Sequence, residues 1–324
     1  KTADVVRITD GKSRNTDAVF SRDGKWVAWS SVAADSARYR IMVADASNPR
    51  SARVVVEEDG AWVPGAFSAD GQTLAATRSN SVNDQQMWLV DLINSRKAQI
   101  KPSPVKVYRG SPVFSPDGRS LFYISDDDSE FRHVARYDLR TDDEDPLTGD
   151  IPWDVEALEL SPNGRTLVFS VNEAGTSRLY TMGAGGGRKN AGPKLQPGEI
   201  ENLRISADSR RVGYTLNGTA GRDAFVWGMG GAPVQWTDSE VGGLDKSAFV
   251  APQLVTYNTF DEVDGKKRQI TAFVYKPKTT GRVPVLVSIH GGPEAQFRPN
   301  FNAFIQYLVQ ELKIAVVAPN VRGS

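Results

Sequence analysis

A short glycine-containing segment, His290 to Pro293, offers the clearest chemistry in the sequence. It follows a compact apolar run, residues 285–289, whose length and β-branched residues predict a strand buried on both faces. Gly291 and Gly292 leave the backbone without Cβ atoms at the carboxyl end of that strand, where open α/β sheets place their ligands. Exposed backbone N–H groups there can hold a developing oxyanion. The segment therefore predicts an oxyanion loop made of His290, Gly291 and Gly292.

The residues after this loop predict a helix and a second strand. Five apolar residues fall at i, i+3, i+4, i+7 and i+11, on one face of a helix: Phe301, Phe304, Ile305, Leu308 and Leu312. Residues 314–318 form another apolar run, so the order is strand, helix, parallel strand, with a right-handed crossover. Residues 319–324 follow as a loop on the same edge. An α/β domain therefore begins here, and we expect it to be incomplete within these residues.

Three residues of these loops each have two interpretations. His290 is either a general base or a loop residue that shapes the oxyanion corner, and its place before Gly-Gly-Pro favours the second. Arg322 either faces a substrate or braces its own loop. Glu294 either pairs with Arg298 or a substrate amine, or is a solvated loop charge. Arg322 and Glu294 are the substrate-binding candidates, although bracing and solvation are the favoured alternatives.

Several other kinds of site are excluded or disfavoured. The chain contains no G-x-S-x-G elbow and no cysteine, and its two histidines are His133 and His290. Neither histidine follows a candidate Ser and Asp in hydrolase order, so we expect no catalytic triad in these residues. Two distant histidines form no metal pattern, and the acidic runs 126–128 and 142–145 lack the spacing of a calcium loop. We therefore expect no metal and no cofactor.

The rest of the chain is built on a repeat. A pattern of the type Phe-Ser-x-Asp-Gly followed by alternating residues occurs five times, at Phe20–Trp29, Phe67–Ala76, Phe114–Tyr123, Leu160–Phe169 and Ile205–Tyr214. The first residues lie 47, 47, 46 and 45 positions apart, which is the period of a four-stranded propeller blade. Ser and Asp bond the turn backbone and Gly supplies a positive φ, so each repeat predicts a β-hairpin.

A third and a fourth strand follow each hairpin, so five complete blades are expected in residues 1–253. Residues 5–9 are predicted to be the fourth strand of another blade. Residues 255–260 and 269–275 form a strand pair around Asp264-Gly265. The expected organisation is a β-propeller domain over 1–253 and the N-terminal part of a second domain over 254–324.

The motifs at the end of the chain, together with this propeller, resemble the prolyl oligopeptidase family of serine peptidases. The similarity is greatest to the branch with acylaminoacyl peptidases and some bacterial dipeptidyl peptidases, in which a strand ending in HGGP precedes a strand leading into an N-x-R-G loop. In this chain these are His290 to Pro293 and Asn320 to Gly323. The resemblance implies that the second domain is an α/β-hydrolase domain and that the propeller has seven or eight blades.

The resemblance also implies a mechanism. A serine would attack the peptide carbonyl, with a His as base and an Asp orienting it, all three lying beyond Ser324. Some relatives have a tyrosine at the position of His290, whose hydroxyl donates to the oxyanion. In this chain a backbone N–H of Gly291 or Gly292 would take the place of that hydroxyl as the donor. The implied substrates are short peptides admitted past the propeller, and residues 1–324 alone are expected to be inactive.

Composition limits the other options. Lys plus Arg and Asp plus Glu both number 39, so no net charge attracts nucleic acid or an anionic membrane. No apolar run approaches the roughly 20 residues of a membrane span, so we expect a soluble protein, cytoplasmic or periplasmic. A homo-oligomer is an open possibility. The alternative function is a non-catalytic propeller that serves as a binding scaffold, although a scaffold has no reason to carry residues 255–324.

Overall fold

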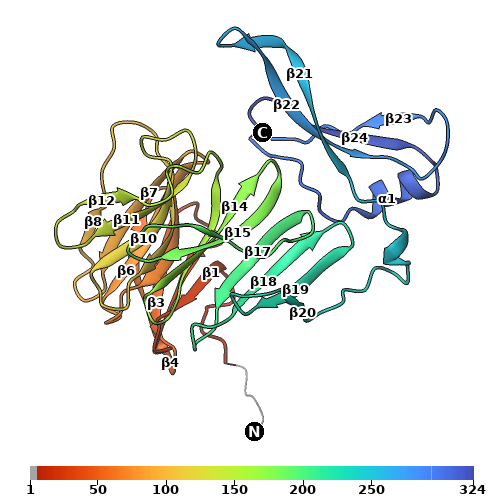
Figure 1. Cartoon of the computed structure of the whole chain (residues 1–324). Coiled ribbons are helices and arrows are strands. Elements are labelled where there is room, and N and C mark those ends of the chain that lie inside the picture. The colour runs from red at the N-terminus through yellow and green to blue at the C-terminus, as the bar shows by residue number, and fades with distance from the viewer. Residues whose placement is uncertain (1–5, 293) are drawn as a thin grey trace. The chain divides into compact units, whose positions relative to one another are not determined.

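The computed structural model describes residues 6–292 and 294–324, and within them the strands form six four-stranded sheets (Figure 1). In five sheets, neighbouring strands follow one another in chain order, as in propeller blades. The sixth sheet has a crossover, and the predicted oxyanion loop follows one of its strands. Across the described ranges, no helix has both the length and the apolar character needed to cross a membrane.

Each of the five blades contains four strands. The first blade has β1 (Arg14–Phe20), β2 (Trp26–Val32), β3 (Tyr39–Asp45) and β4 (Asn48–Glu58). The second has β5 (Ala61–Phe67), β6 (Thr73–Ser81), β7 (Asp84–Asp91) and β8 (Lys97–Gln99). The third has β9 (Arg109–Phe114), β10 (Ser120–Ser125), β11 (His133–Asp138) and β12 (Glu144–Pro146). The fourth has β13 (Val155–Leu160), β14 (Thr166–Glu173), β15 (Thr176–Gly183) and β16 (Asn190–Ala191), and the fifth has β17 (Gly198–Ile205), β18 (Val212–Gly218), β19 (Gly221–Trp227) and β20 (Val234–Gln235).

The predicted hairpin turns are confirmed. In the first repeat, Ser21 Oγ donates to Asp23 Oδ1 at 2.7 Å, and Gly24 has a φ of 73°. The Ser21 hydroxyl and the Lys25 N–H hold the pKa of the Asp23 carboxyl below its ordinary value. The same serine bond recurs in the other four repeats, between Ser68 and Asp70, Ser115 and Asp117, Ser161 and Asn163, and Ser206 and Asp208. In the fifth repeat Ser209 takes the glycine position with a φ of 59°, so the turn is kept without a glycine.

The chain divides into two compact units. One consists of Lys1–Phe169 and Met182–Lys189, and the other of Ser170–Thr181 and Asn190–Ser324. In the first unit, the first strands of successive blades are neighbours: β1 lies beside β5, β5 beside β9, and β9 beside β13. The faces of the first two blades pack together through a buried cluster that includes Ile41, Trp62 and Leu74. The domain boundary near residue 253 stays a prediction.

The sixth sheet lies in the second unit, with the strand order β21-β22-β24-β23. Its elements are β21 (Gln253–Val263), β22 (Lys266–Tyr275), β23 (Val285–Val287), α1 (Ala303–Gln310) and β24 (Ala315–Asn320). β23 and β24 are parallel, with Val287 opposite Val317, and the Ser288 N–H continues the ladder to the Val317 carbonyl at 2.9 Å. The predicted strand, helix and parallel strand are therefore confirmed. The helix begins after Asn302, whose side chain accepts from the Ile305 N–H at 3.1 Å.

Three sequence predictions about these elements are wrong. The first strand is not buried on both faces: Val285 and Val287 are each 59% exposed, because β23 is the edge strand of its sheet. The buried face of the helix differs from the predicted one, because Phe304 is 63% exposed while Val309 is buried. Residues 6–9 are not in a strand, and residue 5 lies outside the described residues.

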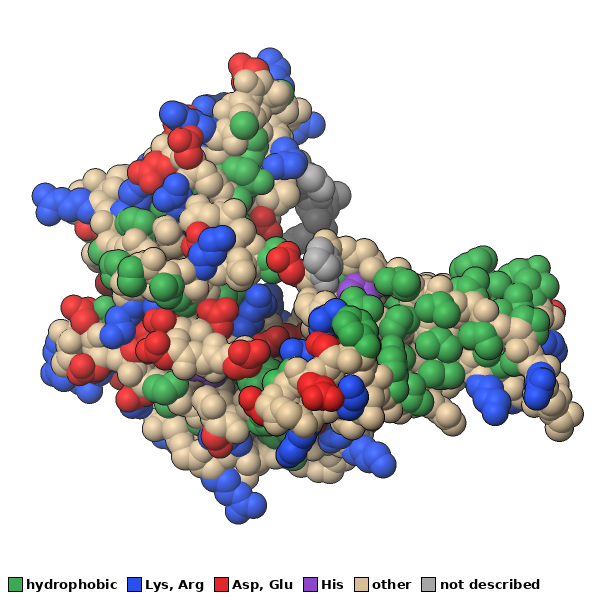
Figure 2. All heavy atoms as spheres, turned by 90° about the horizontal axis from the view of Figure 1, so that it is seen from above, with side chains coloured by type: hydrophobic (Ala, Val, Ile, Leu, Met, Phe, Trp, Pro, Cys, Tyr) green, Lys and Arg blue, Asp and Glu red, His purple; other side chains and the backbone are tan. Residues whose placement is uncertain are grey.

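Apolar side chains collect on the surface of this sheet. β21 and β22 run past the other strands as a two-stranded ribbon (Figure 1), because β24 pairs with β22 only from Thr271 onward. The exposed apolar residues of the sheet and helix include Phe260, Val285, Val287, Ile289 and Phe304. Figure 2 shows hydrophobic side chains gathered on this part of the molecule. An apolar surface of this kind marks a place where further protein can pack.

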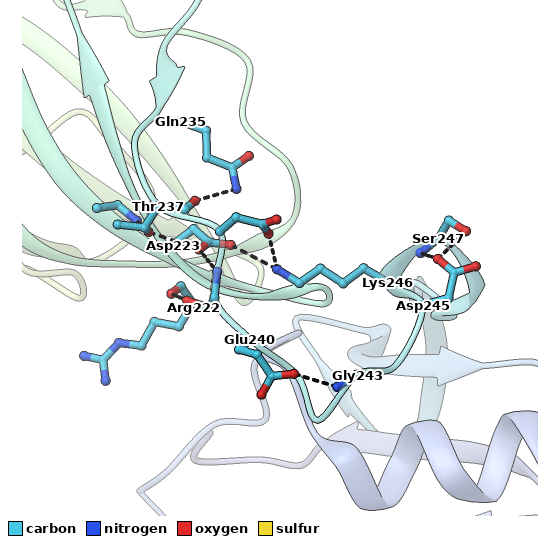
Figure 3. Close-up of polar contacts among 12 residues, drawn as sticks. Arg222, Asp223, Gln235, Thr237, Glu240, Gly243, Asp245, Lys246 and Ser247 are labelled. Atoms are coloured by element: carbon cyan, nitrogen blue, oxygen red, sulfur yellow. Dashed lines mark hydrogen bonds and ion pairs between the residues drawn. The ribbon is translucent and has the colours of Figure 1, made fainter.

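The segment between the fifth blade and the sixth sheet is held to β19 by a polar network (Figure 3). Buried Asp223 accepts from the Ser239 N–H at 2.6 Å and from Thr237 Oγ1 at 3.1 Å. Lys246 lies 3.8 Å from Asp223 and 2.5 Å from Asp238, and the bond to Asp238 raises the pKa of the Lys246 ammonium. Lys246 is the first residue of a 3-10 turn, Lys246–Ala248, which sets the position of its backbone. The segment is therefore tied to the blade that it leaves.

Replacing Tyr275 by Phe should leave the free energy of unfolding unchanged or raise it by about 1 kcal/mol. Tyr275 is 1% exposed and packs edge-on against Phe297, with ring centroids 6.3 Å apart, and Phe keeps that contact. The Tyr275 hydroxyl has no hydrogen-bond partner among the described residues, so the change removes an unsatisfied buried group. Urea unfolding of both proteins measures the difference. A loss of more than about 1 kcal/mol would contradict this account of Tyr275.

The same variant should also change how stability depends on pH. Burial raises the pKa of Tyr275 to about 12, above the ordinary value of 10.0. Between these two values the folded state keeps a proton that the unfolded state releases, so the free energy of unfolding falls as the pH rises. The decrease should be smaller in Tyr275→Phe than in the parent protein, as measured by urea unfolding at several pH values in this window.

Candidate functional site

The candidate site is formed by two loops at the carboxyl ends of β23 and β24. The loop after β23 contains His290, Gly291 and Gly292, and the loop after β24 contains Arg322 and Ser324. Both glycines are exposed and His290 is half-buried, while Pro293 lies outside the described residues. Because β23 and β24 are adjacent and parallel, their following loops leave the sheet at the same edge.

His290 connects these two loops. Its Nδ1 lies 2.9 Å from the Gly291 carbonyl oxygen, and its Nε2 lies 2.7 Å from Ser324 Oγ. A carbonyl oxygen only accepts, so a hydrogen bond there requires a proton on Nδ1. In the neutral ring Nε2 is then the acceptor, and the Ser324 hydroxyl donates to it. The two contacts together select one tautomer of His290 and fix the orientation of its ring.

The hydrogen bond to Gly291 also orients the next backbone N–H. In a trans peptide the C=O of one residue and the N–H of the next point in opposite directions. With the Gly291 carbonyl directed at the imidazole, the Gly292 N–H points away from the ring. Of the two glycines, Gly292 is therefore the one whose N–H direction is set by the contact between His290 and the Gly291 carbonyl.

Gly292 occupies a backbone conformation that requires glycine. Its φ is +132°, a value that residues with a Cβ atom rarely adopt. A Cβ atom at this position would lie 2.8 Å from the Ala295 nitrogen and 2.9 Å from the Ala295 Cβ. At Gly291, in contrast, a Cβ would meet no atom within 4 Å. The sequence offered Gly291 or Gly292 as the oxyanion donor, and the steric requirement for glycine lies at Gly292.

Arg322 is engaged with β21. Its Nη1 lies 3.1 Å from Asp261 Oδ2, and its guanidinium lies 5.1 Å from the centre of the Phe260 ring. The Thr259 hydroxyl, Arg268 and Arg322 all hold the pKa of Asp261 below its ordinary value, with Thr259 contributing most. These contacts support the bracing interpretation of Arg322, and a role in binding substrate stays a prediction. Nothing in the sequence pattern singled out Asp261.

Asn320 fixes the start of the second loop. It is buried at the end of β24, and its side chain bonds both backbone groups of Phe297: Oδ1 accepts from the N–H at 2.8 Å and Nδ2 donates to the carbonyl at 3.2 Å. Phe297 in turn packs against Phe273 and Tyr275. Asn320 belongs to the N-x-R-G motif, but the sequence contained no signal that Phe297 was its partner.

The segment after the glycines is also bonded to blade residues of the same unit. Asn172 Nδ2 donates to Gln296 Oε1 at 2.8 Å, and Asn300 Nδ2 donates to Glu199 Oε2 at 2.8 Å. Arg298 donates to Ser177 Oγ at 2.9 Å. Glu294 is exposed, and its role in binding a substrate amine stays a prediction. The chain from β23 to α1 is thus anchored on β14, β15 and β17, which sequence analysis missed.

Two residues of the acidic run 126–128 have defined partners in the fold and are not solvated charges. Asp126 accepts from the Tyr108 N–H at 2.7 Å, and Asp127 forms an ion pair with the buried Arg109. His133, the second histidine, is buried in β11.

Replacing Ser324 by Ala should keep the Nδ1–H tautomer of His290 but remove the hydrogen bond at Nε2, which changes the Nε2 shift. The Gly291 carbonyl still requires the proton on Nδ1, whereas a hydroxyl can donate or accept and selects no tautomer by itself. Nitrogen-15 NMR of the imidazoles measures this directly, and the spectrum is simple because the chain has two histidines. Ser324→Thr keeps a hydroxyl and should retain the parent spectrum. An unchanged Nε2 shift in Ser324→Ala would contradict the proposed arrangement.

The chain is similar in sequence to several proteins that are named as peptidases. No model of a protein family matches the chain. A probable dipeptidyl-peptidase 5 of Arthroderma benhamiae is 25% identical over 252 residues, which are 72% of this chain and 33% of that protein. The dipeptidyl-peptidase 5 of Trichophyton schoenleinii has the same identity and coverage. The chain therefore spans about a third of the length of these relatives.

Solved structures show the same fold. A puromycin-hydrolysing peptidase of Mycobacterium tuberculosis is similar over 95% of this chain and 50% of its own, with a TM-score of 0.76 and 17% identity. A prolyl endopeptidase of known structure is similar over 98% of this chain and 55% of its own chain, with a TM-score of 0.72 and 14% identity. Four-stranded blades followed by a sheet with a parallel crossover are thus an arrangement known from solved peptidases.

Proposed function

Because the chain resembles the prolyl oligopeptidase family in sequence and in fold, we propose that it carries the propeller and the oxyanion loop of a serine peptidase. The proposed reaction is the hydrolysis of short peptides through an acyl-enzyme intermediate. The observation that carries this proposal is the geometry of the loop after β23, in which His290 and a left-handed Gly292 present a backbone N–H at the carboxyl edge of a parallel strand pair.

The proposed role of Gly292 is to stabilise the tetrahedral intermediate. In α/β-hydrolases one oxyanion donor comes from the loop after the third strand, and the other is the N–H of the residue after the nucleophile. β23 is the third strand of this sheet in chain order, and its loop leads to α1, so Gly292 occupies the corresponding place. A preorganised donor of this kind contributes about 3–4 kcal/mol to the transition state.

The remaining catalytic groups are proposed to lie outside residues 1–324. The chain contains no G-x-S-x-G elbow, and His290 is committed to the Gly291 carbonyl and Ser324. In the proposed reaction the elbow serine attacks the peptide carbonyl, a histidine takes its proton and returns it to the leaving amine, and an aspartate orients that histidine. A hydrolase sheet that continues past β23 would also cover the exposed Val285 and Val287.

Short peptides are the proposed substrates, admitted past the propeller. The names of the similar proteins support this class, since they include dipeptidyl peptidases, prolyl endopeptidases and a puromycin-hydrolysing peptidase. Those names cover both endo- and exopeptidases, so the proposal extends to the peptide class and to no particular side chain. We propose no metal and no cofactor, because acyl transfer by a serine needs neither.

A serine-directed fluorophosphonate should label the protein that carries this chain at a serine outside residues 1–324. A polypeptide made of residues 1–324 should not be labelled, because it lacks the elbow serine. Ser324→Ala is the matched control, since Ser324 is the serine bonded to a histidine nitrogen. Mass spectrometry of the labelled peptide identifies the site. Failure to label the larger protein would favour the non-catalytic scaffold. Labelling at Ser324 would contradict the proposal that the nucleophile lies outside residues 1–324.

Gly292→Ala should lower kcat for a short peptide substrate by about a hundredfold or more, with a smaller change in KM. The new Cβ collides with Ala295 and the φ of +132° is unfavourable for alanine, so the N–H moves away from the oxyanion. Gly291→Ala meets open space and should cost far less. Equal losses in the two variants would contradict the assignment of the donor to Gly292.

A further inference from the structure

An open pocket lies between the hairpin turns of the second and third blades, within the first unit. It has a volume of about 500 Å³, inside the range of roughly 300–1,000 Å³ that is usual for small-molecule sites. Its walls are the β5–β6 turn, the β9–β10 turn, and residues of β7 and of the end of β11. No role for this pocket follows from the proposed peptidase reaction.

The internal repeat explains why space is left at this place. In the first repeat, the residue two positions after the turn glycine is Trp26, and a Cβ added at Gly71 in the next turn would lie 3.3 Å from Trp26 Cδ1. The same position of the second repeat holds the much smaller Thr73, which lines the pocket together with Gly118. A Cβ added at Gly118 would meet no described atom within 4 Å. The pocket is therefore the space that a tryptophan side chain fills one blade earlier.

The next pair of turns is also closed by a side chain. A Cβ added at Gly164, the turn glycine of the fourth blade, would lie 2.9 Å from Pro116 Cδ in the third blade. Among the first four blades, the turns of blades one and two meet through Trp26, and those of blades three and four meet through Pro116. The turns of the second and third blades have no corresponding contact at Gly118 within the described ranges.

The floor of the pocket is apolar. Leu89, Phe114 and Leu139 line it and are half-buried. Val43 is the counterpart of Leu89 in the first blade, and it is only 1% exposed, in the cluster against which Trp26 packs. A ligand with an apolar ring would cover Leu89 as Trp26 helps to cover Val43, and removing this apolar surface from water is favourable.

Two carboxylates lie at the rim of the pocket, and both are accessible. Asp70 and Asp117 are exposed, and each accepts from the serine of its own turn through Oδ1 at 2.6 Å. These serine bonds are the main cause that holds the pKa of both carboxyls below the ordinary value, so both are charged at neutral pH. Arg119 lies 4.0 Å from Asp117, whereas Asp70 has no ion pair among the described residues. The lining itself contains no basic residue within the described chain.

We propose that this pocket binds a small aromatic amine of about the size of an indole. Its ring would pack on Leu89 and Phe114, in the place that the Trp26 side chain occupies one blade earlier, and its ammonium would pair with Asp70 at the rim. An aromatic acid would meet two carboxylates of the same charge, and an amine without a ring would leave the apolar floor exposed to water.

Isothermal titration calorimetry of the protein that carries this chain, with tryptamine as the ligand, tests the proposal. We expect saturable binding at one site per chain. Tryptophol has the same ring but a hydroxyl in place of the ammonium, and indole-3-propionate has a carboxylate. Both should bind at least about tenfold more weakly, because neither pairs with the charge of Asp70. A serine-directed inhibitor that blocks the active site should leave tryptamine binding unchanged, so this result does not depend on the peptidase proposal.

Thr73→Trp identifies the pocket as the site of binding. It gives the second repeat the residue that the first repeat has at this position, so the new indole should fill the pocket and weaken tryptamine binding at least about tenfold. Thr73→Ser leaves the space open and should bind like the parent protein. Thermal unfolding checks that both variants are folded.

Asp70→Asn tests the charged part of the site. The turn should be kept, because the fourth repeat has Asn163 at this position with the same serine bond, at 2.7 Å. The variant should weaken tryptamine by about tenfold while leaving tryptophol unchanged. Asp23→Asn is the matched control, since it changes the same position of the first repeat, where Trp26 fills the space, and it should bind tryptamine like the parent protein.

Three results would overturn the proposal. The first is the absence of tryptamine binding to the folded parent protein, which would mean that the pocket holds water alone. The second is equal binding by the parent protein and folded Thr73→Trp, which would place the ligand elsewhere. The third is equal binding of tryptamine and tryptophol, which would mean that the carboxylates take no part.

Discussion

The parallel pairing of β23 with β24 is the constraint on which the candidate site depends. Val285 to Val287 lie opposite Ala315 to Val317, so the chain leaves both strands at the same edge of the sheet. This brings His290 within 2.7 Å of Ser324, 34 positions later in the chain. The imidazole then directs the Gly291 carbonyl and, through the planar peptide, the Gly292 N–H. An altered register would remove each of these contacts.

Two further sets of contacts hold the loops that this pairing brings together. On one side, Asn320 bonds both backbone groups of Phe297, and Arg322 is held by Asp261. On the other, the segment before α1 is bonded to blade residues of the same unit, as in the pair Asn300 and Glu199. An oxyanion donor is useful only when it is already oriented before the reaction, since reorientation then costs nothing. The contacts around Gly292 would meet that condition if Gly292 is the donor, as proposed.

The parts predicted well from the sequence depend on short-range chemistry. Each hairpin turn is specified by a serine, an acidic or amide side chain and a residue that tolerates a positive φ, all within a few positions, so the blades could be read from the repeat. The predictions about burial failed where they depended on distant partners. Val285 and Val287 are as apolar as a buried strand, yet β23 is an edge strand. Whether a strand lies at the centre or at the edge of a sheet depends on which strands pair with it. The residue types of the strand do not indicate this.

The sequence by itself determined the blades, the crossover unit and the presence of a glycine loop at a strand end, because local turn chemistry and the periodicity of apolar residues specify these features. Only the tertiary structure decided which glycine needs its special conformation, which tautomer His290 adopts, and that Arg322 pairs with Asp261 across 61 positions. These depend on contacts between residues far apart in the chain. Such contacts are fixed by strand register and packing, which leave no trace in the spacing of residues along the sequence.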